Sequence, residues 1–204
     1  MSLRLALSSI FLPPWTARRA LREVAEATTG ALNCLLEDCA PERLAELRGR
    51  DASVRGGLSA RRLAMAKAHH ARVAALVDVL GEAEGIRLAH ETLFCAGVRL
   101  GKAARRRLRT SDDPRDLVRE ARVLYRVLGI RFRAEWLDER EACVRIDRCA
   151  LAAGYGDLTC RALSAADAGV VAGLFPGARF TFQERITEGR PACLARIELP
   201  RRDG

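Results

Sequence analysis

The spacing of apolar side chains is helical over the first two-thirds of the chain. From Ala17 to Leu128 they recur every three or four positions, the period that lines one face of an α-helix. With Gly81 and Gly129 as stop signals, the pattern predicts helices over residues 17–36, 41–49, 60–80, 82–108 and 114–128. We expect Thr16 and Ser59 to act as N-caps. The run Ser111-Asp112-Asp113-Pro114 is a further helix start, because it joins capping residues to a proline.

After Gly129 the period changes to that of a strand. Apolar residues alternate with residues that are mostly polar from Ile130 to Trp136 and again from Ala142 to Ile146. A helix is expected over residues 159–174, and two further alternating stretches cover 180–183 and 192–199. The order strand, strand, helix, strand, strand predicts an α+β fold, in which N-terminal helices pack on a four-stranded antiparallel sheet.

Length and composition fit one compact unit. The chain has 204 residues, of which 49% are hydrophobic and 30% charged, enough to build a full core. We expect a helical N-terminal extension over residues 1–57 and an α+β domain over residues 58–204. No apolar run is long enough to cross a membrane, and residues 3–12 lack a signal-peptide cleavage pattern. We therefore expect a cytoplasmic protein with no membrane partner.

The formal net charge of +9 raises the question of a nucleic-acid partner. Nearly all of the positive charge is arginine, in a composition rich in alanine, glycine and leucine that is typical of GC-rich genomes. The one dense basic run, Arg105-Arg106-Arg107 with Arg109, has no interleaved aromatic residues on which bases would stack. We therefore expect a small-molecule ligand or substrate rather than nucleic acid, and a homodimer stays open.

The reactive side chains gather between Arg148 and Glu198. The chain has seven cysteines and no secretion signal, which favours reduced thiols over a disulfide framework. Cys149 follows a strand, Cys160 begins a helix and Cys193 lies near the start of the last strand, so the fold can bring the three together. Three thiolates and a fourth donor, His90 or Asp167, would suit a metal such as zinc or iron. The alternative is that all three cysteines are buried core residues.

Two charged residues and one thiol are the candidates for chemistry in this region. A helix N-terminus stabilises a thiolate, which makes Cys160 the best candidate for a thiol of lowered pKa. Asp167 is either a solvent-facing helix residue or an acid, base or ligand. Arg185 either pairs with Asp167, holds a substrate carboxylate bidentately or lies on the surface of a strand.

The same stretch resembles a known family. The Cys149 and Cys160 pair, Asp167-Ala168-Gly169, the run Phe182 to Arg185 and Gly189-x-x-x-Cys193 look like L-2-amino-thiazoline-4-carboxylic acid hydrolase-like proteins. Their layout also resembles the vinyl-4-reductase-like (V4R) domain, an antiparallel sheet backed by helices that holds small ligands. The resemblance covers residues 82–199, including the helix around 91–101 and the entry into the sheet at Leu128-Gly129-Ile130.

The resemblance implies two different functions. The hydrolase family implies attack of water on the amidine-like carbon of a small cyclic amino acid, which opens a nonpeptide C–N bond. Cys160 or a metal would then activate the nucleophile, Asp167 would be the acid or base, and Arg185 would bind the substrate carboxylate. The V4R domain implies a non-catalytic module that binds a small ligand or a metal. Zinc-binding V4R sensors carry another cysteine shortly before the glycine, whereas residues 185–188 offer none.

Overall fold

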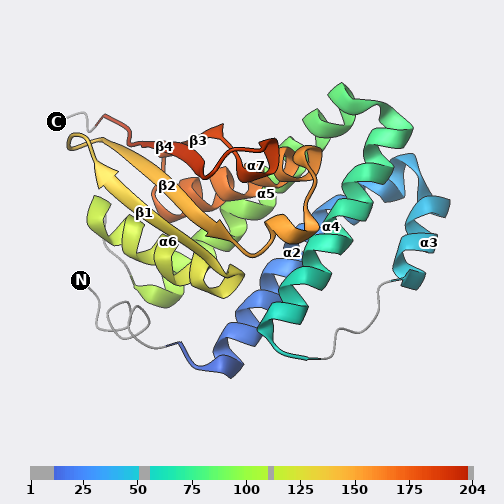
Figure 1. The fold of residues 1–204 in the computed structure, drawn as a ribbon, viewed down its shortest axis with the longest axis horizontal. Coiled ribbons are helices and arrows are strands. Elements are labelled where there is room, and N and C mark those ends of the chain that lie inside the picture. The colour runs from blue at the N-terminus through green and yellow to red at the C-terminus, as the bar shows by residue number, and fades with distance from the viewer. Residues whose placement is uncertain (1–11, 51–55, 110–112, 202–204) are drawn as a thin grey trace.

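The described residues, 12–50, 56–109 and 113–201, form an α+β fold in the computed structural model, with a four-stranded antiparallel sheet against helices (Figure 1). The α-helices are α2 (Pro14–Cys39), α3 (Pro41–Arg50), α4 (Leu58–Leu80), α5 (Glu82–Leu108), α6 (Pro114–Leu128) and α7 (Asp157–Leu174). The strands are β1 (Ile130–Trp136), β2 (Glu141–Cys149), β3 (Arg179–Glu184) and β4 (Cys193–Glu198), with 3-10 turns η1 (Ala152–Gly154) and η2 (Ile186–Glu188). The predicted fold class is confirmed.

The helix starts differ from the predicted ones at two caps. α2 begins at Pro14, behind an N-cap at Pro13, so Thr16 lies inside the helix. α4 begins at Leu58 after Gly57, which likewise puts Ser59 inside the first turn. Proline fits the first helical turn because its missing N–H is not needed there. Asp113 caps α6 by accepting a hydrogen bond from the Arg115 N–H at 2.8 Å, whereas residues 110–112 lie outside the described residues.

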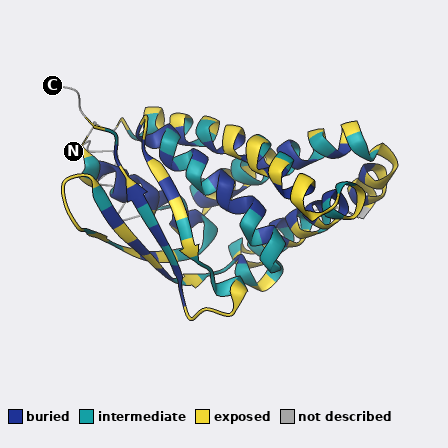
Figure 2. Cartoon of the chain, turned by 90° about the horizontal axis from the view of Figure 1, so that it is seen from above, coloured by how far each residue is buried: buried dark blue, intermediate teal, exposed yellow. Residues whose placement is uncertain are grey.

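The sheet has one buried face and one exposed face. Its order is β1-β2-β4-β3, and every neighbouring pair is antiparallel. The buried face packs against α6 and α7, as in Val144 and Ile197 against Leu117 and Val171. Figure 2 shows the alternation of buried and exposed residues along the strands. On the exposed face Arg133 and Arg145 both pair with Asp147.

Helices α5 and α7 approach at backbone distance through glycines. A Cβ atom at Gly97 would lie 2.2 Å from the Ala166 carbonyl oxygen, and one at Gly169 would lie 2.2 Å from the Phe94 carbonyl oxygen. One turn on, Gly101 meets the Val170 carbonyl oxygen in the same way. Gly97 and Gly101 lie one turn apart, a spacing of small residues that lets a neighbouring backbone come close, and α7 is that neighbour. This contact fixes the position of α7 behind the sheet.

The N-terminal helix is part of the same compact unit. Leu32 and Leu36 of α2 are fully buried and share a core with Leu76 of α4 and Leu93 of α5. In Figure 1, α2 runs alongside α4 and leads away from the sheet toward α3. Residues 14–39 therefore help to build the interior on which the site depends. Within the described part of the chain, no helix has the length and apolar character needed to cross a membrane.

Candidate functional site

A mostly apolar cavity of about 170 Å³ lies between the helices and the buried face of the sheet. Its wall is formed by residues of five helices and of all four strands. The residues that line it include Ala20, Val24, Thr28, Met65, His69, Leu100, Ala103, Ala104, Ala121, Leu124, Tyr125, Leu128, Ile130, Ile146, Cys149, Leu151, Tyr155, Cys160, Leu163, Ser164, Asp167, Val170, Val171, Phe182 and Cys193. Glu23 and Arg107, which form an ion pair, also belong to the wall.

The cavity is narrow and long. It contacts α7 from Cys160 to Val171, which corresponds to a helical rise of about 16 Å. Its volume is close to that of an engineered apolar cavity of about 150 Å³ that holds benzene. A space of this size spread over such a length takes an unbranched chain more readily than a bulky ring.

Most of the chemistry predicted from the sequence meets in this cavity. Cys149, Cys160, Cys193 and Asp167 all line it. Cys149 comes from the end of β2, Cys193 from the start of β4, and the other two from α7, one near its first turn and one near its middle. These elements converge because β2 and β4 are neighbours in the sheet and α7 packs on its buried face. The sequence positions are far apart, and the sheet pairing brings them together.

The three thiols are protonated at neutral pH. Burial raises the pKa of both Cys149 and Cys160 to about 11 and raises the pKa of Cys193 as well. The expectation of a lowered pKa at Cys160 is therefore wrong. Cys160 lies in the first turn of α7, but its side chain lines the mostly apolar cavity. Desolvation there raises the pKa of the thiol by more than the field of the helix N-terminus lowers it.

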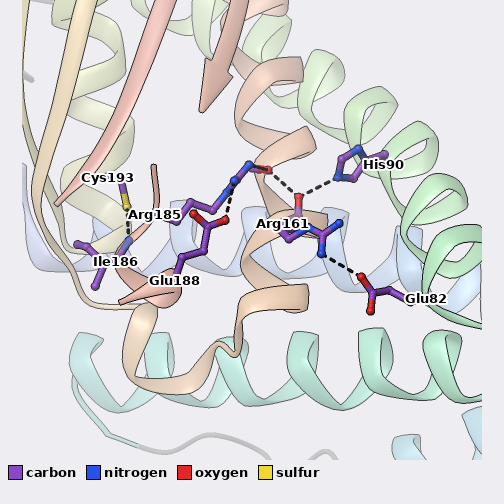
Figure 3. A network of polar contacts seen from close by, with 8 residues as sticks. Glu82, His90, Arg161, Arg185, Ile186, Glu188 and Cys193 are labelled. Carbon is purple, nitrogen blue, oxygen red and sulfur yellow. Dashed lines mark hydrogen bonds and ion pairs between the residues drawn. The ribbon is translucent and has the colours of Figure 1, made fainter. Parts of the chain in front are cut away.

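Of the two predicted fourth metal donors, Asp167 lines the cavity with the thiols, whereas His90 does not. His90 is exposed on α5, and its Nε2 atom lies 2.9 Å from the Arg161 carbonyl oxygen. Figure 3 shows it on the far side of Arg161 from Cys193. Among the residues that the structure describes, no group of three or more His, Cys, Asp or Glu side chains is arranged to hold a metal ion. Zinc or iron at these thiols stays a prediction.

Asp167 places a half-buried carboxyl in the cavity wall. Tyr125 donates a hydrogen bond from its hydroxyl to Asp167 Oδ1 at 2.9 Å. Burial raises the pKa of Asp167 to about 7, although the Tyr125 bond and the Arg185 charge both act to lower it. A carboxyl of this pKa exchanges its proton near neutral pH, as a general acid or base must. The solvent-facing alternative for Asp167 is thereby excluded.

Arg185 lies next to the cavity without lining it. Its Nη1 atom donates to Glu188 Oε1 at 3.0 Å, and its Nη2 atom donates to Ser164 Oγ at 3.3 Å (Figure 3). The guanidinium also stacks on the Phe182 ring, 5.2 Å from the ring centroid. Arg185 therefore acts on Asp167 through its charge, and it has no direct pair with that carboxyl. Binding a substrate carboxylate inside the cavity would require this side chain to leave Glu188.

A second polar group in the wall is a chain of three hydrogen-bonded side chains. Thr28 donates its hydroxyl proton to the Val24 carbonyl oxygen at 2.8 Å, so it must accept at its contact of 2.8 Å with His69 Nε2. His69 Nε2 thus carries the proton, and Nδ1 accepts the Tyr155 hydroxyl at 2.8 Å. Burial lowers the pKa of His69 to about 3 and keeps the ring neutral. All three side chains line the cavity.

The sequence did not predict that Thr28, His69 and Tyr155 belong to the site. His69 was read as one of a pair of helical histidines, and its neighbour His70 does point elsewhere, to Thr159 Oγ1 at 2.8 Å. One signal was available: the chain has two tyrosines, Tyr125 and Tyr155. Both place their hydroxyl groups on an ionisable partner in the cavity wall. A buried tyrosine needs such a partner for its O–H.

Comparisons with known proteins establish similarity of fold alone. No protein-family model matches the chain, and no curated protein matches it. A solved structure of a trafficking protein particle complex subunit 3 from Naegleria fowleri, covalently bound to palmitic acid, has a TM-score of 0.54 at 14% identity. The match covers 69% of this chain and 95% of that one.

A second solved structure is less similar in shape. An H-NOX protein from S. oneidensis in the Fe(II)NO ligation state has a TM-score of 0.49 at 12% identity. The match covers 89% of this chain and 98% of the other. The resemblance to the hydrolase-like and V4R-like proteins therefore rests on the sequence motifs.

Proposed function

We propose that this protein is a binding module that holds a small, elongated and mainly apolar ligand in the cavity. The observation that carries the proposal is the cavity itself, because its wall is mostly aliphatic and it reaches along α7 from Cys160 to Val171. Ligand sites are typically apolar with a small number of polar groups that orient the ligand. Asp167 and the hydroxyl groups of Tyr125 and Tyr155 are such groups here.

The similar fold of the Naegleria fowleri subunit supports this proposal, because that protein is covalently bound to palmitic acid. We propose noncovalent binding for the present chain. Its cavity thiols are held in the protonated form by burial, and a protonated thiol is a poor nucleophile.

Asp167 determines which polar group the ligand can carry at its end. Tyr125 occupies Oδ1, and within the described part of the chain no protein group donates to Oδ2. A ligand hydroxyl can donate to this oxygen, whereas a ligand carboxylate would place a second negative charge beside it. The module should therefore prefer a chain that ends in a hydrogen-bond donor over a chain that ends in a carboxylate.

Hexanol should bind more tightly than hexanoate at pH 8, by about tenfold or more if one like-charge contact is avoided. Isothermal titration of the full chain with each compound would measure this. Ala103→Phe fills the cavity wall and should abolish hexanol binding. Ala74→Phe is the matched control, because Ala74 is an exposed helical residue outside the cavity. Equal binding to both variants, or none to the wild type, would contradict the proposed function.

A second candidate function is the hydrolysis of a nonpeptide C–N bond in a small cyclic amidine or amino acid. One observation favours it: a carboxyl with a pKa of about 7 lies inside a cavity. Such a group can take a proton from water and return it to a leaving nitrogen at neutral pH. Asp167 would be the acid and base, Cys160 or a metal held by the thiols would supply the nucleophile, and Arg185 would bind the substrate carboxylate after leaving Glu188.

The hydrolase proposal is tested with 2-amino-thiazoline-4-carboxylate as substrate. The rate of ring opening is measured for the wild type, together with the zinc and iron content of the same sample. If Asp167 transfers the proton, the rate should be about a hundredfold or more lower in Asp167→Asn. Cys160→Ser separates thiol chemistry from acid–base chemistry. Wild-type protein that leaves the compound intact would remove this candidate and would not affect the binding proposal.

A further inference from the structure

A groove outside the cavity gathers arginines from four elements. It is an open space of about 540 Å³ at the junction of α4, α6, β1 and β2, and its polar wall consists of Ser59, Arg62, Arg122, Arg126, Arg131 and Arg148. Gly129, Ile130, Phe132 and Ala150 supply the rest. Among the described residues, none that lines this arginine groove is acidic.

The arginine groove differs from the rest of the exposed sheet face. There, Arg133 and Arg145 both pair with the carboxylate of Asp147. Arg131 and Arg148 instead face each other directly across β1 and β2, and like charges at opposed positions destabilise a sheet. In the described part of the chain neither of them has an acidic partner. Arg122 is held over the Phe132 ring, 6.0 Å from the centroid.

One arginine of the groove is fixed in place. Arg62 donates from Nε to the Val127 carbonyl oxygen at 2.8 Å and from Nη2 to the Arg126 carbonyl oxygen at 3.0 Å. These bonds cap the C-terminal end of α6 and keep the charged guanidinium of Arg62 in the wall of the groove. The α4 N-terminus lies at the same place, because Ser59 belongs to its first turn, and no side chain caps it. The positive end of a helix adds to the field of the arginines.

We propose that the arginine groove binds a phosphate group. Several guanidinium groups converge on one concave surface, and guanidinium forks match the oxygens of phosphate in charge and geometry. A bound phosphate would remove the repulsion between Arg131 and Arg148, which the described protein residues leave uncompensated. The groove and the cavity share Ile130 in their walls, yet the proposal does not depend on the cavity ligand.

Pyrophosphate is the probe for a free phosphate, and phosphatidylcholine vesicles with phosphatidic acid are the probe for a lipid headgroup. Titration of the full chain with pyrophosphate should give saturable binding. Arg131→Gln and Arg148→Gln should each weaken it about tenfold, the loss expected from one charge-assisted contact. Arg179→Gln is the matched control, because Arg179 is an exposed sheet arginine with the same charge outside the groove.

The outcomes separate the sources of phosphate. Binding of pyrophosphate alone assigns the groove to a soluble phosphate, and co-sedimentation with vesicles that is lost in Arg131→Gln assigns it to a headgroup. Failure of both probes overturns the proposal. An equal loss in Arg179→Gln also overturns it, since net charge rather than the groove would then explain the binding.

Discussion

Replacing Asp167 with asparagine should make the protein lose about 3 kcal/mol of stability between pH 7.5 and pH 4.5, a range over which we expect the wild type to stay nearly constant. The reason is that two titratable groups in the cavity wall, one half-buried and one buried, respond to acid in opposite directions. As pH falls, protonation of Asp167 stabilises the folded state, whereas protonation of His69 stabilises the unfolded state.

The contribution of Asp167 falls as pH rises. Its pKa is about 7 in the folded protein and has an ordinary value of 3.8, so between these values the folded state binds more protons than the unfolded state. Stability from this group is therefore fully present below pH 3.8 and is lost as pH rises toward 7. Between pH 4.5 and 7.5 the loss is about 3 kcal/mol.

The contribution of His69 runs the other way. Its pKa is about 3 in the folded protein against an ordinary 6.5, so the unfolded state binds more protons between these values. Stability from His69 is present above pH 6.5 and is lost as pH falls toward 3. Down to pH 4.5 the loss is about 3 kcal/mol, which offsets the gain from Asp167.

Urea unfolding of the wild type and of variants at pH 4.5 and 7.5 measures these terms. His69→Gln, which keeps polar atoms toward Thr28 and Tyr155, should show the opposite trend to Asp167→Asn and gain stability in acid. Asp78→Asn is the control, since Asp78 is exposed and its loss should leave the wild-type profile. If the free energy of unfolding of Asp167→Asn depended on pH in the same way as that of the wild type, the raised pKa of Asp167 would be contradicted.

Gly97→Ala should lower the free energy of unfolding by about 3 kcal/mol, the upper part of the range for overpacked interiors. Alanine is normally the better helix residue by about 1 kcal/mol. Here its Cβ would lie 2.2 Å from the Ala166 carbonyl oxygen, a backbone atom that moves only if α7 moves. The helices must then separate, which disturbs the cavity wall on α7 as well.

Gly30→Ala is the matched control for this prediction. Gly30 also lies inside a long helix, α2, but a Cβ atom there would meet nothing within 4 Å. This variant should gain up to about 1 kcal/mol. Thermal and urea unfolding of both variants would give the comparison. A stable Gly97→Ala protein would mean that α5 and α7 do not touch at backbone distance.

The elements of the fold were predictable because each depends on local periodicity. The change of period at Gly129 marked the start of the sheet, and residues 159–174 were predicted as a helix despite their glycines; the helix begins two residues earlier, at Asp157. The caps at Pro13 and Gly57 were missed, since proline and backbone geometry compete with hydroxyl capping. The glycines in α5 indicated a close backbone contact, and only the structure identified α7 as the partner.

The sequence picked out four residues that the structure places in the wall of one cavity, but it did not predict their proton affinities. Cys149, Cys160, Cys193 and Asp167 were chosen from their places on elements, and the cavity does join them. Their proton affinities depend on burial, which arises from contacts between elements distant in the chain. A helix start suggested a lowered pKa at Cys160, but burial in the cavity wall raises the pKa of its thiol. His69 and Tyr155 were missed because they are 86 positions apart.

By itself, the sequence determined the order of helices and strands, the apolar face of each, and a set of reactive residues between Arg148 and Glu198. These follow from nearest-neighbour geometry, which the chain carries locally. Only the tertiary structure decided that these faces leave a narrow cavity, that Asp167 and His69 are desolvated in its wall, and that Arg131 and Arg148 meet in a groove. Desolvation and convergence belong to surfaces that exist only after the sheet and helices have packed.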